Sequence, residues 1–464
     1  MRLYLINPYN PYVCTTFAKK SRWTKYRVWK PLGLLVLASL TPDEWDITLI
    51  DENVKLPFYA DMPRPDLVGI TAFTSQAARA YELADAWRHR RVPVVLGGIH
   101  VTMRLEEALE HADTVVTGEA ESVWGQVLKD ASQGKLKRVY KGARQELNQS
   151  PVTKNDLLPM DYAFGAIQTA RGCPLNCSFC SVTAFNGRHL RYRPIETVLK
   201  EIKLMREQHF LFVDDNLIGT RKDHIARTKK LFRAMINEKL NKNWGAQVTI
   251  NLADDEELLR LAKKAGCMAV FIGFESPSAE GLVEVNKQFN IQKGRDLKAS
   301  VHRIKKHGIV VIGSFIIGLD VDQKGIGRLI ADTASAYGLD ALNTLFLTPL
   351  PGTTLWEKMK RQDRILANDF PKDWQYYTFG FPITRHTHLQ WTDMVREYEI
   401  CRQTFYSNTR IFRRVLDSLI NTRRPVTTLM STLALKGNYQ RIEDCRRYLD
   451  LKKTESETAA LNQI

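Results

Sequence analysis

The stretch that decides the fold is Arg171-Gly172-Cys173-Pro174-Leu175-Asn176-Cys177-Ser178-Phe179-Cys180, which places three cysteines at the spacing C-x3-C-x2-C. The chain has only seven cysteines in 464 residues, so chance is a weak explanation for this crowding. Three thiolates in one short loop are well placed to hold an iron–sulfur cluster, with Cys173, Cys177 and Cys180 as its metal ligands. No fourth cysteine lies nearby, so one iron stays open for another ligand. A structural zinc with His189 as fourth ligand is the alternative.

The cysteine loop follows the first of six strand candidates between residues 161 and 352, and helix candidates lie between the strands. The strand candidates are 166–170, 210–214, 245–250, 269–274, 310–317 and 342–347. Strands that alternate with helices predict a parallel sheet. Six such units predict a partial (β/α)6 barrel, short of the eight in a closed one, and a second doubly wound domain is the alternative. Active-site residues are expected at the carboxyl ends of these strands.

Residues 1–135 show the same alternation and predict an α/β domain with a doubly wound parallel sheet. Such a sheet binds ligands at the carboxyl ends of its strands. The candidate binding turns are 51–55, 71–75, 97–100 and 118–121. Residues 136–160 are polar and lack periodicity, so we expect a linker there.

The chain is basic, with 67 Lys and Arg against 51 Asp and Glu and a net charge of +16. Residues 353–464 are expected to form a helical, basic C-terminal region, in which 392–435 carry apolar residues at helical spacing among arginines. This region either packs on the barrel or contacts a membrane surface peripherally. No nucleic-acid module is visible. The N-terminus reads as a first strand instead of a secretion signal, so we expect a cytoplasmic protein.

The cysteine spacing at the start of a βα barrel, with Phe179 before the last cysteine, resembles the radical S-adenosylmethionine (SAM) superfamily. The resemblance implies a 4Fe-4S cluster on the three cysteines and SAM at the open iron, which yields a 5′-deoxyadenosyl radical on reduction. Phe179 would lie near the adenine, and Asp215 would hold the methionine amino end. Glu275 would bind the ribose or the ammonium, and Ser314 lies in the strand whose backbone contacts the adenosyl group.

The N-terminal region resembles the cobalamin-binding domain that precedes many radical SAM enzymes. Residues 92–102 fit its strand and Gly-Gly turn, and residues 113–121 fit its next strand and acidic turn. The resemblance implies that Gly97, Gly98 and Glu119 bind the cofactor. Two glycines after a strand let the backbone approach the nucleotide tail, and Thr71 and Ser75 could bond that tail. A flavodoxin-like domain that binds nothing is the alternative.

One motif of cobalamin domains is missing. Asn53 stands where many of these domains carry a lower axial histidine, so ligation of cobalt by that histidine is not expected. His100 is an alternative ligand in principle, although a packed histidine is more common. The basic, aromatic segment 12–30 either covers the corrin or forms a solvated loop.

Together these resemblances predict a cobalamin-dependent, class B-like radical SAM methyltransferase that methylates an unactivated carbon of a small-molecule or lipid-like substrate. A low-potential electron donor is implied, whereas the residues do not identify a catalytic acid or base. Two alternatives remain open. One is a non-methylating cyclisation or rearrangement on the same scaffold, and the other is a non-catalytic iron–sulfur or cobalamin carrier.

Overall fold

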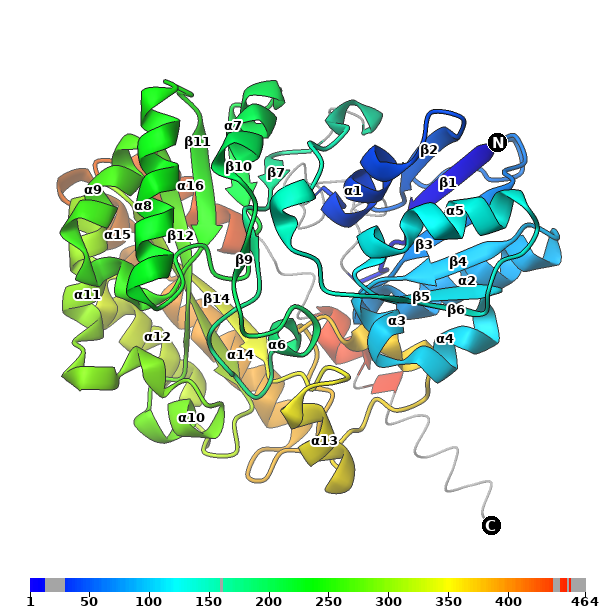
Figure 1. Cartoon of the computed structure of the whole chain (residues 1–464). Helices are drawn as coiled ribbons and strands as arrows, with labels where there is room; N and C mark the ends of the chain where they lie inside the picture. Colours follow the sequence, from blue (N-terminus) through cyan, green and yellow to red (C-terminus); the bar gives the residue numbers. More distant parts are fainter. Residues whose placement is uncertain (13–29, 159–161, 437–442, 449, 452–464) are drawn as a thin grey trace, which may run out of the picture.

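The chain forms two parallel six-stranded sheets that lie side by side, with further helices at the C-terminal end (Figure 1). The structure is a computed structural model, and it describes residues 1–12, 30–158, 162–436, 443–448 and 450–451. Within these residues no helix is long and apolar enough to cross a lipid bilayer.

The N-terminal sheet has the strand order β2-β1-β3-β4-β5-β6, and every neighbouring pair is parallel. Its strands are β1 (Arg2–Asn7), β2 (Asp46–Asp51), β3 (Leu67–Thr71), β4 (Val94–Gly97), β5 (Thr114–Gly118) and β6 (Val139–Gly142). The helices between them are α1 (Leu32–Leu40), α2 (Ala77–His89), α3 (Ile99–Met103), α4 (Leu105–His111) and α5 (Trp124–Ser132). The strand order reverses between β1 and β3, which is where such a sheet opens a ligand crevice.

Both faces of the N-terminal sheet are covered, because residues of one strand alternate between two cores. Leu3 and Leu5 pack with residues of α1 and α5, whereas Tyr4 and Ile6 pack with residues of α2. This period of two is the direct consequence of strand geometry. The predicted doubly wound α/β domain is therefore confirmed.

The barrel sheet has the strand order β14-β13-β12-β11-β10-β7 and is also parallel throughout. Its strands are β7 (Gly165–Ile167), β10 (His209–Phe212), β11 (Asn243–Gln247), β12 (Cys267–Glu275), β13 (Val310–Ile317) and β14 (Ala341–Phe346). The helices are α7 (Ile195–Leu204), α8 (Lys222–Asn237), α9 (Glu256–Lys264), α10 (Ala279–Glu284), α11 (Leu297–Lys306) and α12 (Ile326–Tyr337). The first and last strands do not pair with each other, so the partial (β/α)6 barrel is confirmed.

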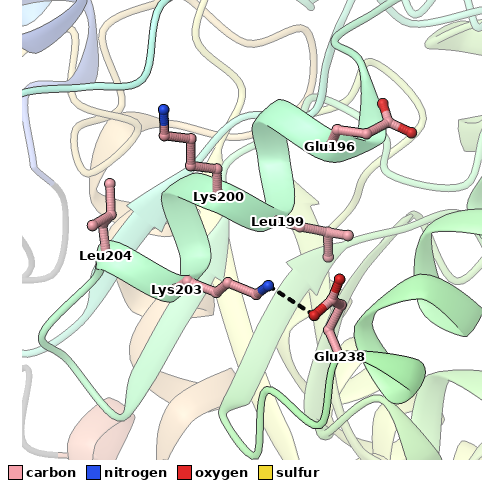
Figure 2. Close-up of a pocket in the computed structure, with 6 residues that line it drawn as sticks. All are labelled: Glu196, Leu199, Lys200, Lys203, Leu204 and Glu238. Atoms are coloured by element: carbon pink, nitrogen blue, oxygen red, sulfur yellow. Dashed lines mark hydrogen bonds and ion pairs between the residues drawn. The ribbon is translucent and has the colours of Figure 1, made fainter.

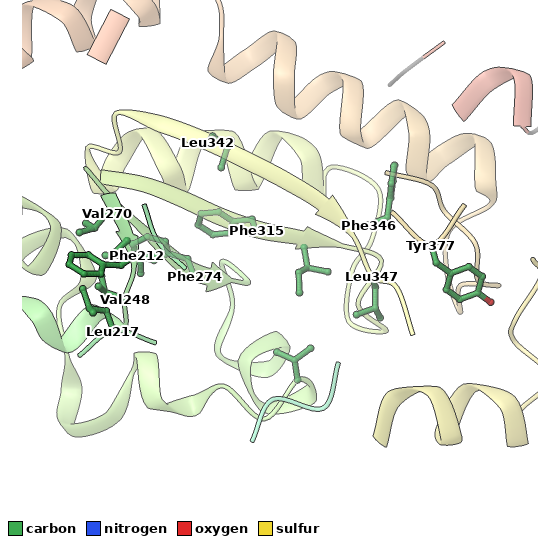
Figure 3. Packing of buried hydrophobic residues seen from close by; sticks show 14 of the residues in the cluster. Phe212, Leu217, Val248, Val270, Phe274, Phe315, Leu342, Phe346, Leu347 and Tyr377 are labelled. Carbon is green, nitrogen blue, oxygen red and sulfur yellow. The ribbon is translucent and has the colours of Figure 1, made fainter. Parts of the chain in front are cut away.

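A continuous apolar core fills the barrel and reaches its C-terminal rim (Figure 3). The rings of Phe274 and Phe315 stack at 5.6 Å, and Phe212 meets Trp244 edge to face at 5.1 Å. Such aromatic pairs contribute more than their buried area alone. Tyr377, far along the chain, joins the same cluster.

The remaining elements complete the site and the C-terminal region. A two-stranded antiparallel ladder joins β8 (Ala170–Arg171) to β9 (Arg191–Tyr192), and α6 (Ser181–Phe185) lies between them. The C-terminal helices are α13 (Thr354–Arg361), α14 (Trp391–Phe405), α15 (Asn408–Ile420) and α16 (Pro425–Lys436), so the helical C-terminal region is confirmed. The basic segment 12–30 lies almost wholly outside the described residues.

One predicted boundary is wrong. Residues 136–160 do not form a linker throughout, because β6 adds the sixth strand to the N-terminal sheet within them. The pairing of Val115 with Val139 and of Thr117 with Lys141 shows the register. A segment of four residues that includes a lysine shows too little hydrophobic alternation to be distinguished from a loop. Its strand conformation is decided by pairing with β5.

Candidate functional site

The three cysteines lie in a closed loop, residues 172–190, which we call the cluster loop. The β8–β9 ladder joins its two ends, with Arg171 directly opposite Arg191. Gly172 has φ +105°, and a side chain on it would collide with the carbonyl oxygen of His189 at 2.3 Å. The backbone N–H of Cys173 donates to the Gly187 carbonyl at 3.2 Å. Glycine at 172 is therefore required for the loop to close.

The cysteine thiols are sheltered from water and lie close enough to interact electrostatically with one another. Cys177 is buried, whereas Cys173 and Cys180 are half-buried. Burial raises the pKa of all three thiols, to about 12 for Cys180. Without metal these groups stay protonated, and a bound metal would replace the protons.

The chemistry of this donor set fits an iron–sulfur cluster. Across the part of the chain that the structure describes, no three His, Cys, Asp or Glu side chains converge as they would around a single metal ion. A 4Fe-4S cluster makes no such demand, because each cysteine binds a different iron. Three neighbouring thiols therefore suit a cluster with one iron left open.

Two aspartates after β10 hold the base of the cluster loop. Asp215 accepts hydrogen bonds from the Gly172 N–H at 3.2 Å and from the Asn186 side-chain amide at 2.9 Å. Asp214 Oδ1 accepts from the N–H and the hydroxyl of Thr169, both at 3.0 Å. Asp215, predicted to hold the methionine amino end, thus has contacts that also shape the loop.

Asp214 also offers an unused acceptor. Its Oδ2 atom is buried and has no hydrogen-bond partner among the described residues. Burial raises the pKa of this carboxyl to about 7, because hydrogen bonds to Oδ1 offset only part of the lost solvation. A buried carboxylate oxygen without a donor is suited to receive one from a ligand.

Glu275 ends β12 in a strained conformation and pairs with a buried lysine. Its φ of +66° is in the left-handed region, which is costly for a residue with a side chain and is concentrated at functional sites. The Lys287 Nζ atom lies 3.3 Å from Glu275 Oε1. Lys287 also interacts electrostatically with the Cys173 and Cys177 thiols, so it brings a positive charge to the cluster loop.

The segment that carries Lys287 also binds the cluster loop directly. The Ser178 N–H donates to the Val285 carbonyl at 3.2 Å, and the Asn286 side-chain amide donates to the Asn176 carbonyl at 2.7 Å. Sequence reasoning missed Lys287. The only available signal was a lysine twelve residues after Glu275, and a buried position cannot be read from that spacing.

The other residues predicted for SAM lie in the same half of the molecule. Phe179 belongs to the cluster loop and packs against the barrel core. Ser314 is buried in the middle of β13, paired in register with Gly273 of β12 and Asn343 of β14. Their contacts with a cofactor stay predictions.

The residues predicted for cobalamin lie at the carboxyl edge of the N-terminal sheet. Thr71 ends β3 opposite Gly97, which ends β4. Gly98 follows with φ +102° and ψ −178°. A side chain there would lie 2.9 Å from the backbone N and O atoms of Ala72 and from the Thr71 hydroxyl. Gly97 would accept a methyl group without a clash, because the nearest atom, the Val116 carbonyl oxygen, would lie at 3.7 Å. Thr71, Gly97, Gly98 and Ser75 are all partly exposed, and their contacts with a ligand stay predictions.

Glu119 is buried and faces the barrel half instead of open solvent. Its carboxylate forms a two-point ion pair with Arg191, accepts the Gln145 N–H at 2.8 Å, and lies 3.5 Å from Arg171. Burial raises its pKa, but these partners outweigh burial and hold the pKa below its usual range. Its contact with cobalamin stays a prediction, whereas its ion pairs with the two arginines that flank the cluster loop are direct.

The carboxyl edges of the two sheets therefore face each other. Glu119 follows β5 of the N-terminal sheet, and its partners Arg171 and Arg191 enclose the cluster loop. Figure 1 shows α6 between the two sheets. On the same side, Gly352 approaches Met103 so closely that a side chain at 352 would meet its sulfur at 2.4 Å.

The side chains at the two positions considered for an axial ligand of cobalt, 53 and 100, already contact other groups of the protein. His100 is fully buried, with Nδ1 3.3 Å from the Thr74 hydroxyl and Nε2 3.4 Å from Glu107. Asn53 is also buried and donates to Asp51 and to the Pro8 carbonyl. His100 in this arrangement is a packed histidine.

A shallow hollow on the outer face of α7 lies away from this site. Its lining residues are Glu196, Leu199, Lys200, Lys203, Leu204 and Glu238, and Figure 2 shows the ion pair of 2.7 Å between Lys203 and Glu238. None of the residues predicted for a cofactor contributes to it.

Two family models match the two halves of the chain. Residues 167–332 match the Radical SAM superfamily, and residues 24–128 match the B12 binding domain. The fold and the site thus define an iron–sulfur radical enzyme with a second, B12-binding domain.

The relatives are consistent with this class. The chain is 32% identical over 371 residues to the bacteriochlorophyllide d C-12(1)-methyltransferase of Chlorobaculum tepidum, a match that covers 75% of this chain and 77% of that protein. It is 27% identical to the hopanoid C-2 methylase of Rhodopseudomonas palustris, over 73% of this chain and 66% of that protein. The chain therefore belongs to the family of cobalamin-dependent radical SAM enzymes, and its cofactors are a 4Fe-4S cluster, SAM and cobalamin.

A solved structure shares the fold. The cobalamin-dependent SAM radical enzyme OxsB, with aqua-cobalamin and SAM bound, superposes with a TM-score of 0.65 at 15% identity, over 95% of this chain and 71% of that chain.

Proposed function

We propose that this enzyme transfers a methyl group to an unactivated carbon of a hydrophobic small molecule or a lipid-like substrate. The observation that carries the proposal is that the carboxyl edge of the B12-binding sheet faces the cluster loop across the pairs of Glu119 with Arg171 and Arg191. A substrate between the edges would be close to both cofactors. The bacteriochlorophyllide and hopanoid methylases among the relatives support the reaction type.

The chain's own residues bind and orient, while the bound cofactors supply a carbon radical and a transferable methyl group. Cys173, Cys177 and Cys180 would hold the cluster. Asp214 offers a buried carboxylate oxygen, and the Glu275–Lys287 pair offers one group of each charge. These charges complement the ammonium and carboxylate of an amino acid end, so we assign the three residues to SAM.

The test is anaerobic reconstitution with iron, sulfide and hydroxocobalamin, followed by incubation with SAM whose methyl group carries carbon-13. Dithionite replaces the low-potential electron donor, and bacteriochlorophyllide d and a hopanoid serve as substrates. A product heavier by one labelled methylene unit supports the proposal. A product of unchanged mass or with fewer hydrogens would indicate cyclisation or rearrangement. SAM left intact by reduced, iron-loaded protein would indicate a carrier.

We also propose that the α15–α16 hairpin docks on an anionic lipid surface. Large apolar side chains of this hairpin point to solvent, with Ile420 79% exposed, Val426 72% and Phe412 64%. Further exposed apolar residues on the two helices are Leu416, Leu419, Leu429, Met430 and Leu433. An exposed apolar patch of this extent marks an interaction surface.

The inner face of the hairpin is polar, which is the reverse of an ordinary surface helix. Arg414, Ser418, Thr428 and Thr432 are buried, and Thr432 donates to the Asp340 carbonyl at 3.1 Å. The apolar side chains are thus directed outward by hydrogen bonds on the opposite face.

Charge favours lipid over a second copy of the chain. Residues 408–436 include six basic residues (Arg410, Arg413, Arg414, Arg423, Arg424 and Lys436) and one acid, Asp417. Arg414 is buried on the inner face, so the basic excess of the outer surface comes from the others. Two such surfaces would repel each other, whereas an anionic membrane attracts basic side chains and accepts apolar ones.

Vesicle flotation tests this surface. Wild-type enzyme is expected to float with vesicles that contain phosphatidylserine and to remain unbound with phosphatidylcholine alone. Ile420→Glu should abolish flotation, whereas Leu204→Glu, at an exposed apolar residue on α7, should not. Equal flotation of both variants would refute the lipid surface. A concentration-dependent dimer that Ile420→Glu dissociates would show that a second copy covers the hairpin instead.

A further inference from the structure

The ends of the cluster loop carry two arginines that need counter-charges. Arg171 in β8 is directly opposite Arg191 in β9, within a ladder of only two residue pairs. Like charges at directly opposed positions destabilise a strand pair. Both side chains are also largely buried, with 12% and 7% of their surface exposed. The ladder therefore depends on acidic partners.

Those partners come from the other half of the chain. Glu119 pairs with both guanidinium groups, at 2.8 Å from Arg191 Nη1 and 3.5 Å from Arg171 Nη1. Glu121 Oε1 lies 2.5 Å from Arg171 Nη2. Glu119 and Glu121 flank the turn after β5, at the edge where the B12-binding sheet presents its ligand-binding turns.

The network continues into the cluster loop. Arg191 also donates to the Asn186 carbonyl, and the Asn186 side-chain amide donates to Asp215, which in turn accepts the N–H of Gly172 beside Cys173. An unbroken chain of hydrogen bonds thus runs from Glu119 to the residue before the first cysteine. Removing one partner from a buried ion pair leaves an uncompensated charge, so loss of the Glu119 charge is expected to disturb the network.

We propose that Glu119 and Glu121 are positioning residues for the iron–sulfur cluster, acting from the B12-binding domain through Arg171 and Arg191. One turn then both borders the cobalamin site and fixes the ends of the cluster loop. We therefore expect assembly of the cluster to change cobalamin affinity through this turn, and because linkage is reciprocal, cobalamin then changes cluster assembly by the same factor. The inference depends on the proposed function only for the identity of the two cofactors.

The test compares Glu119→Gln, which keeps the size of the side chain and removes its charge, with wild-type enzyme. Cobalamin affinity is measured by visible-spectrum titration before and after anaerobic cluster reconstitution, and the reduced cluster is examined by electron paramagnetic resonance. Wild type is expected to change its cobalamin Kd by about fivefold or more on reconstitution. In Glu119→Gln this change should vanish, and the spectrum of the cluster should broaden or shift while iron is still taken up.

Two further variants separate positioning from general stability. Asp340 directly precedes β14, at the amino ends of the barrel strands, and forms an equally buried ion pair with Lys305 at 3.1 Å. Asp340→Asn breaks this pair and should leave the cluster spectrum and the coupling to cobalamin unchanged. Glu121→Gln weakens the network at its more exposed member, so it tests the idea even if Glu119→Gln does not fold. Wild-type spectra and wild-type coupling in a folded Glu121→Gln or Glu119→Gln protein would overturn the inference. Wild-type protein that takes up no iron would instead overturn the proposed function.

Discussion

Gly97 and Gly98, at the end of β4, allow a sharp test of the cobalamin-binding edge, because they differ in backbone conformation and in the space around them. Gly98 has φ +102° and ψ −178°, a conformation essentially restricted to glycine, and a methyl group there would lie 2.9 Å from Ala72 backbone atoms. The conformation costs a non-glycine residue about 1–3 kcal/mol. Overpacking adds about 1–3 kcal/mol. Gly98→Ala is therefore expected to destabilise the protein by about 2–6 kcal/mol.

Gly97→Ala is the matched control for stability and the probe for the ligand. The nearest atom to its added methyl group is the Val116 carbonyl oxygen at 3.7 Å, which is ordinary contact. We expect Gly97→Ala to change the unfolding free energy by less than about 1 kcal/mol. If the cobalamin tail approaches this backbone, the same methyl group should weaken cobalamin binding by about tenfold, which corresponds to about 1.4 kcal/mol.

Urea unfolding and visible-spectrum titration with hydroxocobalamin measure the two effects separately. A Gly98→Ala protein as stable as wild type would refute the account of the turn. Unchanged cobalamin affinity in a stable Gly97→Ala protein would show that no part of the cofactor reaches position 97.

Three further changes have defined outcomes. Burial raises the pKa of Asp322 from 3.8 to about 7, so folding favours its protonated form. The free energy of unfolding is therefore expected to fall by up to about 4 kcal/mol between pH 4 and pH 7. Asp322→Asn should remove this dependence when stability is measured by urea unfolding between pH 5 and pH 8, and an unchanged slope would contradict this. Cys177→Ala should abolish the cluster's visible absorption and bind cobalamin with the affinity that the wild type has before cluster reconstitution, and retained iron would argue against the cysteine set. Trp374→Ala should cost about 3–5 kcal/mol in urea unfolding because Trp374 is fully buried and donates to Glu107 at 2.7 Å; Trp374→Phe should restore most of this loss.

Local patterns made the architecture and the cluster predictable. Alternating strands and helices predicted both parallel sheets, and the C-x3-C-x2-C spacing predicted the cluster loop, because these signals depend on residues a few positions apart. The rule that ligands bind at the carboxyl ends of parallel strands singled out Asp215, Glu275 and Gly97, which do lie at such strand ends, whereas their contacts with the cofactors stay predictions. The resemblance to a family supplied the cofactors, and the family comparisons confirmed them.

Contacts between distant residues were decided by the tertiary structure alone. Glu119 reads as a cofactor-binding residue in sequence, yet its partner Arg191 lies 72 positions away. Lys287 became part of the site only because the segment after α10 folds onto the cluster loop. The outward direction of the apolar side chains in α15 follows from which face the barrel accepts. Hydrophobic periodicity predicts that a helix has an apolar face. What covers that face depends on packing against segments that are distant in sequence, so only the tertiary structure shows it.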